Sequence, residues 1–125
     1  MRKKNGLPLL AALGLSLFAL TACSNQETLH FQGEGENWEV EYTANVTNET
    51  DQTIDYVIRY IGEGDVSEAV DYQIGETTVT NETLEDNRYV EHAGSGCQNC
   101  SVLQQEDTID FSIQWEENNE RFTLE

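Results

Sequence analysis

Two cysteines, Cys97 and Cys100, stand three positions apart in the segment "GSGCQNC", residues 94 to 100. Thiols at this C-x-x-C spacing serve three chemistries: they form a disulfide, they exchange electrons with another thiol pair, or they supply two of the four ligands of a zinc ion. Each chemistry needs different surroundings. The segments on either side of the pair therefore decide among them.

A redox-active pair requires support that this sequence lacks. A thioredoxin-like C-x-x-C places its first cysteine at the amino end of a helix within a βαβ unit, where backbone dipoles lower the thiol pKa. Here glycines precede Cys97, and the segment "SVLQQED" that follows Cys100 is long enough for at most two turns of helix. We therefore predict a local disulfide that holds a glycine-rich loop, with thiol-disulfide exchange as the alternative.

A zinc site would need two further ligands. The only histidines are His30 and His92, and His92 lies five residues before Cys97. Four ligands of the Cys2His2 type are therefore available. They can meet only if the first predicted strand, which contains His30, crosses beside residues 92 to 100. We predict no metal ion and no cofactor, and keep these four residues as the alternative metal site.

Motifs that mark other reactions are missing from the sequence. It contains no G-x-S-x-G, no P-loop and no H-E-x-x-H. With two histidines, a Ser/His or Cys/His dyad has few ways to form. We therefore predict no catalytic residue and a protein that is not an enzyme.

The amino-terminal segment has the order of features found in bacterial secretion signals. Basic residues 2 to 4 precede an apolar stretch over residues 7 to 20, which is shorter than the ~20 residues that a membrane-spanning helix needs. The stretch ends in "LTAC", and this ending resembles a lipobox, whose cysteine receives a diacylglyceryl thioether and a palmitate chain. We predict that residues 1–22 are a cleaved signal peptide and that Cys23 is the lipidated residue.

Lipidation of Cys23 predicts where the protein resides. Two or more acyl chains on one residue give durable membrane attachment, so we expect the protein on the outer face of the bacterial cytoplasmic membrane, with residues 23–28 as lipidated cysteine and tether. Residues 29–125 then form a single domain. With Cys23 occupied by lipid, Cys97 and Cys100 are left as a pair in an oxidising exterior, which supports the disulfide.

The charge is strongly one-sided. Three of the six basic residues precede Cys23 and all 24 acidic residues follow it, so the chain after the signal has three arginines, no lysine and a formal net charge of −21. The negative electrostatic field of so many carboxylates opposes binding to nucleic acids and to anionic lipid headgroups. The acyl chains on Cys23 are then the expected membrane contact. We interpret the excess of carboxylates as a well-hydrated surface suited to a saline or alkaline exterior. The alternative, functional interpretation is that the carboxylates attract cations or basic peptides.

Hydrophobic residues alternate with polar ones along much of the chain after residue 28. Such a period of two is typical of half-buried strands, and turn residues separate the segments at intervals of about ten residues. No long helical period lies between them, although 67–70 is compatible with one turn of helix. We predict an all-β fold, a small antiparallel β-sandwich that is immunoglobulin-like in general architecture. The expected strands cover 29–31, 38–46, 54–60, 66–74, 77–80, 88–90, 109–115 and 122–124.

Two further expectations concern the aromatic residues and the last hairpin. The tryptophans Trp38 and Trp115 and most tyrosines fall in the apolar alternation, so we predict that they pack in the core. The last two strands are predicted to form a hairpin with its turn near residues 117–119, because asparagine favours turn conformations.

Scattered positions resemble a known group of proteins. They are Phe31, Gly33 and Glu34 before Trp38; Gly94, Gly96, Cys97 and Cys100; and the Ile113-x-Trp115 strand followed by Glu120 and Leu124. Together with the lipobox, this pattern is similar to small surface lipoproteins of Gram-positive Firmicutes, of Bacillus-like type, with a G-x-G-C-x-x-C loop. The resemblance implies a membrane-anchored β-domain and carries over no functional residue.

Together these features predict a membrane-anchored, extracytoplasmic lipoprotein that acts as a non-enzymatic binding or envelope-interaction module. The alternative is a thiol-disulfide or metal-handling lipoprotein that uses Cys97 and Cys100.

Overall fold

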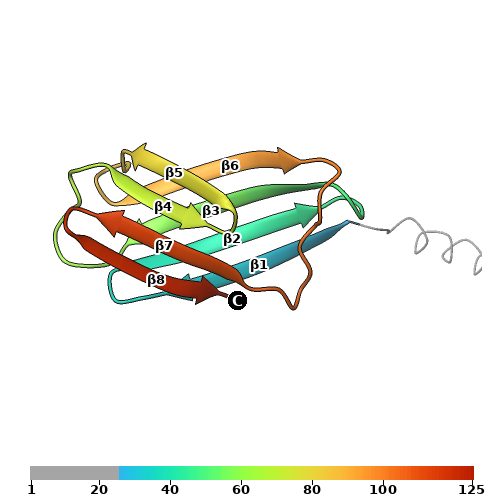
Figure 1. The fold of residues 1–125 in the computed structure, drawn as a ribbon, viewed down its shortest axis with the longest axis horizontal. Coiled ribbons are helices and arrows are strands. Elements are labelled where there is room, and N and C mark those ends of the chain that lie inside the picture. The colour runs from blue at the N-terminus through green and yellow to red at the C-terminus, as the bar shows by residue number, and fades with distance from the viewer. Residues whose placement is uncertain (1–25) are drawn as a thin grey trace, which may run out of the picture.

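The computed structural model describes residues 26–125, which form two antiparallel sheets of four strands each and contain no helix. The prediction of a small all-β sandwich is confirmed (Figure 1). The predicted signal peptide and Cys23 lie outside the described residues. Residues 26–125 also provide no helix that is long and apolar enough to cross a membrane.

The chain crosses repeatedly between the sheets. The first sheet has the order β1 (Glu27–Glu34), β2 (Trp38–Val46), β3 (Gln52–Tyr60), β6 (Tyr89–Cys97); the second has the order β5 (Thr77–Glu82), β4 (Val70–Ile74), β7 (Ile109–Trp115), β8 (Asn118–Leu124). β3 and β6 are neighbours in the first sheet, and the strands that follow them in the chain, β4 and β7, are neighbours in the second.

The core lies between the two sheets, where the alternating hydrophobic side chains of both meet. The tryptophans are buried as predicted: Trp38 is fully buried on β2 and Trp115 is 5% exposed on β7, with ring centroids 5.5 Å apart. All buried hydrophobic residues of the described chain fall between Leu29 and Leu124. Both sheets therefore contribute to this core.

Six of the eight strands, all except β2 and β7, have bounds that differ from those predicted. The strand predicted over 88–90 is β6, which continues to Cys97, and its residues 91–96 are exposed and therefore carry no hydrophobic alternation. β1 begins at Glu27, inside the predicted tether, because backbone pairing with Val46 extends it beyond its hydrophobic part. β4 begins only at Val70. Residues 67–70 form no helical turn, and Val66 is buried from a loop.

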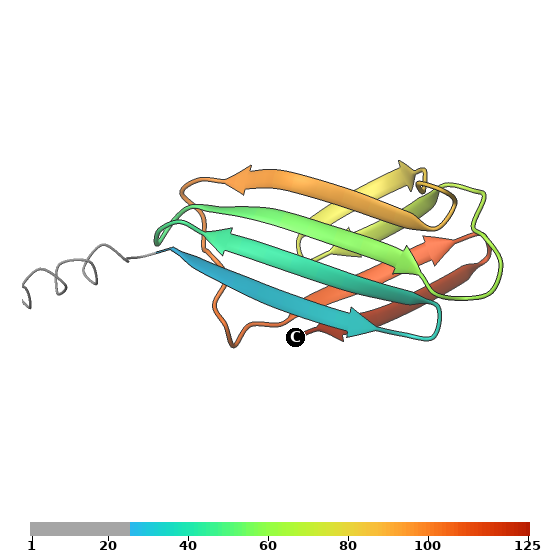
Figure 2. The same cartoon turned by 180° about the vertical axis from the view of Figure 1, so that it is seen from behind.

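The sandwich is closed along one side and open along the other. On the closed side, β1 runs beside β8 (Figure 2), and Gln32 and Glu125 exchange two backbone hydrogen bonds of 3.0 and 2.9 Å. On the other side, the edge strands are β6 of the first sheet and β5 of the second. No strand pairing joins β5 to β6 in the described chain, so backbone hydrogen bonds between strands do not close the sandwich there.

The hairpin of β7 and β8 turns at Glu116 and Glu117, slightly earlier than predicted, and Asn118 and Asn119 belong to β8. This register places Ile109 opposite Leu124 and Phe111 opposite Phe122. Core packing therefore outweighs the turn preference of the asparagines. As a consequence, Glu116 adopts a φ of +53°, and Glu117 has no positive φ.

Replacement of Glu116 by glycine is expected to stabilise the domain by about 0.5 to 1 kcal/mol. A positive φ at the first residue only of a two-residue hairpin loop is the pattern of the type II′ turn, which prefers glycine there. Urea denaturation of wild type and Glu116→Gly measures the effect. Glu117→Gly is the control because its backbone needs no such freedom, and equal gains in both variants would contradict the explanation.

Candidate functional site

Cys97 and Cys100 are joined in the structure by a disulfide at the end of β6, with the sulfur atoms 2.09 Å apart and the Cα atoms 6.1 Å apart. The disulfide loop, residues 97–100, lies against the turn that joins β2 to β3. The Cys100 N–H donates to the carbonyl of Thr50 at 2.9 Å, and the Asn99 N–H donates to the Asp51 carboxylate at 3.1 Å. The loop is thus held at the start of the crossing from the first sheet to the second.

The surroundings of the disulfide loop favour neither a thiolate nor a redox exchange. No helix begins at either cysteine, so no helix dipole is available to lower a thiol pKa. The Asp51 carboxylate contacts the loop, and its pKa is lowered by hydrogen bonds from the Asn48 side chain and the Asn99 backbone. A carboxylate that stays ionised opposes a second negative charge beside it.

The alternative zinc site is not assembled. His30 lies on β1 and His92 on β6, the two opposite edge strands of the first sheet. With strands about 4.8 Å apart, three strand spacings separate them by roughly 14 Å. His30 alternates with buried Leu29 and Phe31 and so points outward, whereas His92 stands opposite buried Tyr56 on the inner face. Within residues 26–125 no three His, Cys, Asp or Glu side chains gather closely enough to hold a metal ion.

Removal of the disulfide is expected to lower the free energy of unfolding by about 2 kcal/mol, which is the chain-entropy estimate for so short a loop. The measurement is urea denaturation of the double variant Cys97→Ser/Cys100→Ser against wild type, with wild type in strong reductant as the matched control. A pair that exchanges readily with glutathione near about −200 mV would instead identify the loop as a redox site.

A row of aromatic rings crosses the inner face of the first sheet and ends at its open edge. Phe31, Tyr42, Tyr56 and His92 stand opposite one another on β1, β2, β3 and β6. Successive ring centroids are 6.2, 6.1 and 5.1 Å apart. At the edge, His92 Nε2 lies 2.7 Å from Ser95 Oγ. The row joins the core to an accessible surface on β6.

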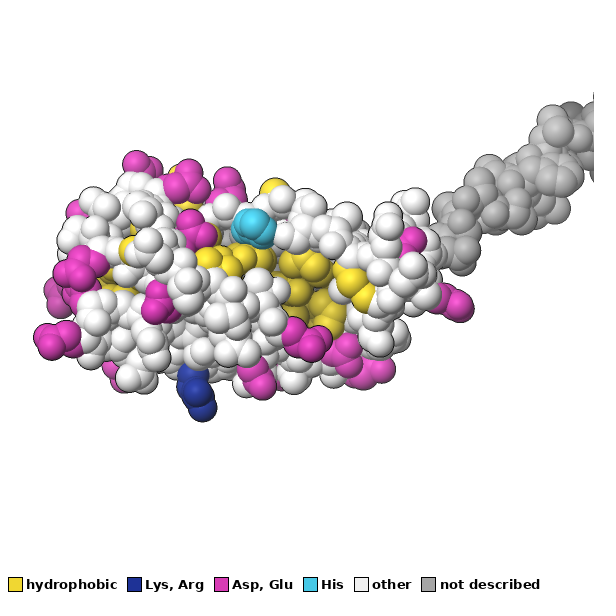
Figure 3. Space-filling model, turned by 45° about the horizontal axis from the view of Figure 1, so that its top comes forward, with side chains coloured by type: hydrophobic (Ala, Val, Ile, Leu, Met, Phe, Trp, Pro, Cys, Tyr) yellow, Lys and Arg dark blue, Asp and Glu magenta, His cyan; other side chains and the backbone are white. Residues whose placement is uncertain are grey.

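The second sheet covers this inner face only partly. The strands of the first sheet have 8 or 9 residues, whereas β4 has 5 and β5 has 6. At about 3.3 Å per residue, β4 and β5 are roughly 10 Å shorter than the strands that they face. Figure 3, which brings the β5 and β6 edges forward, shows hydrophobic side chains in a hollow beside a histidine. Tyr42, Ile54 and Val79 point inward but are only partly buried.

Two tyrosines tie the sheets together next to this hollow. The hydroxyls of Tyr56 on β3 and Tyr72 on β4 form a buried hydrogen bond of 2.7 Å. Burial raises the pKa of both phenols, and for Tyr72 the hydrogen bond with Tyr56 raises it further. Both phenols therefore stay neutral at physiological pH. The nearby Glu82 carboxylate adds to the rise at both positions.

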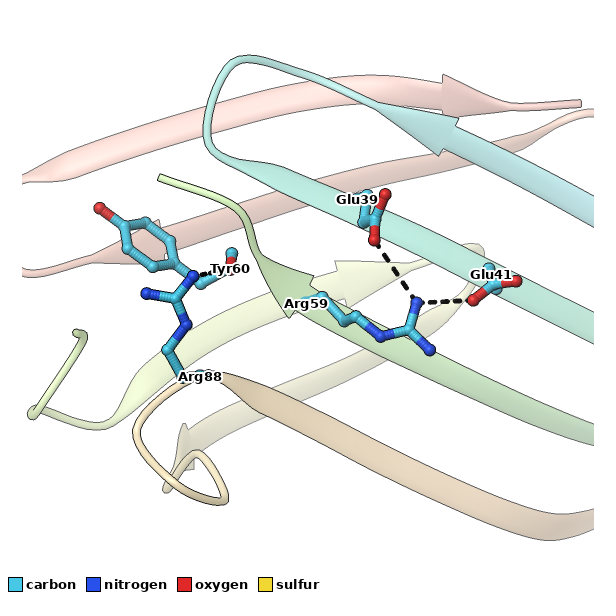
Figure 4. Close-up of polar contacts among 5 residues, drawn as sticks. All are labelled: Glu39, Glu41, Arg59, Tyr60 and Arg88. Atoms are coloured by element: carbon cyan, nitrogen blue, oxygen red, sulfur yellow. Dashed lines mark hydrogen bonds and ion pairs between the residues drawn. The ribbon is translucent and has the colours of Figure 1, made fainter. Parts of the chain in front are cut away.

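Two of the three arginines of the described chain are engaged by its own groups (Figure 4). Arg59 on β3 pairs with Glu41 at 2.6 Å and with Glu39 at 3.5 Å across the outer face of the first sheet. Arg88 lies over the Tyr60 ring at 5.3 Å and donates to the carbonyls of Tyr60 and Gly64. These cations fix local structure, and the large excess of carboxylates around them stays unneutralised.

Sequence reasoning did not find the open side. It assigned the tyrosines to the core, which holds for Tyr56 and Tyr72 but only in part for Tyr42. Alternation shows which face of a strand is hydrophobic, but it does not show how much of that face the opposite sheet covers. The available signal was the shortness of the predicted segment over 77–80 beside the long segment over 38–46.

The fold defines a small two-sheet β-sandwich protein with a disulfide loop and one open side. Comparisons of the chain with protein-family models, with curated proteins and with solved structures found no match.

Proposed function

We propose that this protein is a lipid-anchored, extracytoplasmic binding module, held by Cys23 at the outer face of the bacterial cytoplasmic membrane. The observation that carries the proposal is the position of β1, which begins at Glu27, four residues after Cys23. Four extended residues reach about 14 Å at most. Such a tether holds the domain close to the membrane by one end.

That end is defined by the strand register. Glu27 pairs with Val46, Val46 with Gln52, and Gln52 with Cys97, so the disulfide loop belongs to the end nearest the anchor. The strands run along the long axis of the sandwich (Figure 1). The open β5–β6 side therefore extends away from the membrane, where a partner can approach it.

A binding role accounts for the surface features better than catalysis does. The open side combines an unpaired strand edge, partly buried hydrophobic side chains and a surplus of carboxylates. These features suit the recognition of another molecule. The disulfide then acts as a staple for the β6–β7 crossing.

Expression of the full chain in a Gram-positive host tests the anchor. Wild type is expected in the membrane fraction, with an intact mass that starts at Cys23 and includes the diacylglyceryl group. Cys23→Ser is expected to lose both the lipid and the membrane association. The matched control, Cys97→Ser/Cys100→Ser, should remain in the membrane, because its thiols lie outside the lipobox. Unlipidated wild-type protein in the medium would overturn the proposal.

A further inference from the structure

The outer face of the second sheet is polar throughout. On β4, β7 and β8, the side chains that alternate with the inward-pointing residues are those of aspartate, glutamine, serine, asparagine, arginine and threonine. β5 adds Thr78 and Thr80 on either side of Val79, which packs against the core. This face is turned toward the viewer in Figure 1, away from the first sheet. It is a separate surface from the open side.

Most polar groups of this face have no partner in their own chain. Within residues 26–125, six of its side chains take part in no hydrogen bond or ion pair: Thr78, Thr80, Ser112, Gln114, Asn119 and Arg121. Gln73 makes one long contact, 3.3 Å from its Nε2 to the Gly75 carbonyl. Arg121 thereby differs from Arg59 and Arg88, which are both engaged.

The outer face of the first sheet is organised differently. There the Thr28 hydroxyl donates to the Asn45 side chain at 3.2 Å. Arg59 pairs with Glu41 at 2.6 Å across neighbouring strands. Side chains of the first sheet thus satisfy one another, whereas those of the second sheet keep their donors and acceptors available to a ligand.

Two adjoining hollows form a groove over the polar face. One, of about 380 Å³, lies over β4, β7 and β8, and the other, of about 300 Å³, lies over all four strands. Both are lined by Gln73, Ser112 and Arg121, which stand opposite one another in the strand register. On β7 the groove extends from Asp110 to Gln114, roughly 13 Å at about 3.3 Å per residue. Each volume is typical of a ligand cleft.

The chemistry of the groove indicates which ligand it suits. A protein interface needs aromatic or aliphatic side chains at its centre, and none projects from this face. Anionic polymers are disfavoured by the formal net charge of −21 that follows the signal. Amides, hydroxyls, the Arg121 guanidinium and the carboxylates of Asp71 and Asp110 together offer many donors and many acceptors. A neutral ligand rich in hydroxyl groups uses both kinds.

We propose that this groove binds a neutral glycan, an extended chain of sugar units. Sugar hydroxyls donate to Asp71 and Asp110 and accept from Gln73, Gln114 and Arg121, and the length of the groove favours a chain over a single sugar. The inference names the ligand class of the proposed binding module and rests on that role. The lipid anchor is tested separately by Cys23→Ser, so that either part can fail while the other holds.

The test uses residues 24–125 without lipid, which retain every core residue described above. The probes are three neutral hexasaccharides that differ in linkage or substituents: cellohexaose, maltohexaose and chitohexaose. Hexagalacturonate is the anionic control. Calorimetry gives the affinities, and NMR of the nitrogen-labelled domain follows the backbone amides together with the side-chain amides of Gln73 and Gln114.

Binding of at least one neutral hexasaccharide is expected, with NMR shifts at both side-chain amides and none on the outer face of the first sheet. Its affinity should change less than about twofold between low and high salt, because no ion pair forms. Hexagalacturonate should bind at least about fivefold more weakly. Absence of binding by all three neutral probes, shifts confined to another surface, or equal or tighter binding of hexagalacturonate would overturn the proposal.

Amide variants locate the site. Gln73→Ala/Gln114→Ala is expected to weaken binding of the neutral hexasaccharide at least about tenfold, because two hydrogen-bonding groups are lost from the groove. The matched control, Gln32→Ala/Gln104→Ala, removes two exposed amides from β1 and from the β6–β7 crossing, and should change affinity less than about twofold. Urea denaturation checks that both variants stay folded. Equal losses in both would show association with the whole surface and would overturn the assignment to the groove.

Discussion

Replacement of Trp38 by alanine is expected to lower the free energy of unfolding by about 3 to 5 kcal/mol, the usual cost of removing a large aromatic side chain from a core. Trp38 has no exposed surface and packs edge-on against Tyr60, at 5.1 Å, and Trp115, at 5.5 Å. These contacts join β2 and β3 of the first sheet to β7 of the second. Its loss would therefore leave a cavity between the sheets.

A second substitution separates the volume of the ring from its polar atom. The buried indole Nε1 of Trp38 has no hydrogen-bond partner among the described residues, so its removal sacrifices no bond. Trp38→Phe is expected to cost only about 1 to 2 kcal/mol, through lost packing. Urea denaturation of residues 24–125, followed by far-UV circular dichroism, measures both variants. If Trp38→Ala fails to fold, Trp38→Phe remains measurable. A loss of about 4 kcal/mol in the unfolding free energy of Trp38→Phe would contradict this account.

The alternation around Trp38 also shows what sequence reasoning can recover. The segments 38–46 and 109–115 were predicted with the bounds that β2 and β7 have in the structure, because each places a continuous hydrophobic row against the opposite sheet. The same rule failed for β6 after Val90. There the chain is held by pairing with β3 while its side chains are exposed, and backbone pairing leaves no hydrophobic pattern.

The sequence predicted one part of the candidate site, the disulfide loop, and gave no prediction of the other part, the open side. The disulfide loop was predicted from local spacing, which needs no knowledge of the fold. The open side depends on the relative lengths of strands in different sheets and on the crossing from β5 to β6. The alternative zinc site failed for a similar reason, since only the strand order shows that His30 and His92 occupy opposite edges.

Two positions of the lipoprotein resemblance, Gly33 and Leu124, lie on the closed side of the sandwich, whereas Gly94, Gly96 and Cys97 lie on β6 at the other side. A Cβ atom at Gly33 would lie 2.6 Å from the Thr123 carbonyl oxygen, and one at Gly35 would lie 2.5 Å from the Glu120 carboxylate. Leu124, at the end of β8, is fully buried. Gly33 and Gly35 therefore allow the close approach of β1 and β8.

Replacement of Glu120 by alanine is expected to cost about 2 to 3 kcal/mol, the second large effect. One carboxylate oxygen accepts hydrogen bonds from the backbone N–H groups of Asn37 and Trp38, both at 3.1 Å. The other is 3.1 Å from the Asn37 side-chain nitrogen and 3.2 Å from its backbone nitrogen. Without the carboxylate, two partly buried backbone donors lose their partner, and hydrogen bonds to a charged group are the stronger kind.

The matched control is Glu117→Ala, which removes an exposed carboxylate from the turn of the same hairpin and should change stability by less than about 0.5 kcal/mol. Urea denaturation gives the two differences, and hydrogen exchange reports on the amides of Asn37 and Trp38 directly. Glu120→Gln should fall between them, because its amide keeps one acceptor oxygen. If Glu120→Ala matched Glu117→Ala and left exchange at residues 37 and 38 unchanged, the carboxylate would not hold β8 to the β1–β2 turn, and close packing at Gly33 and Gly35 alone would account for the closed side.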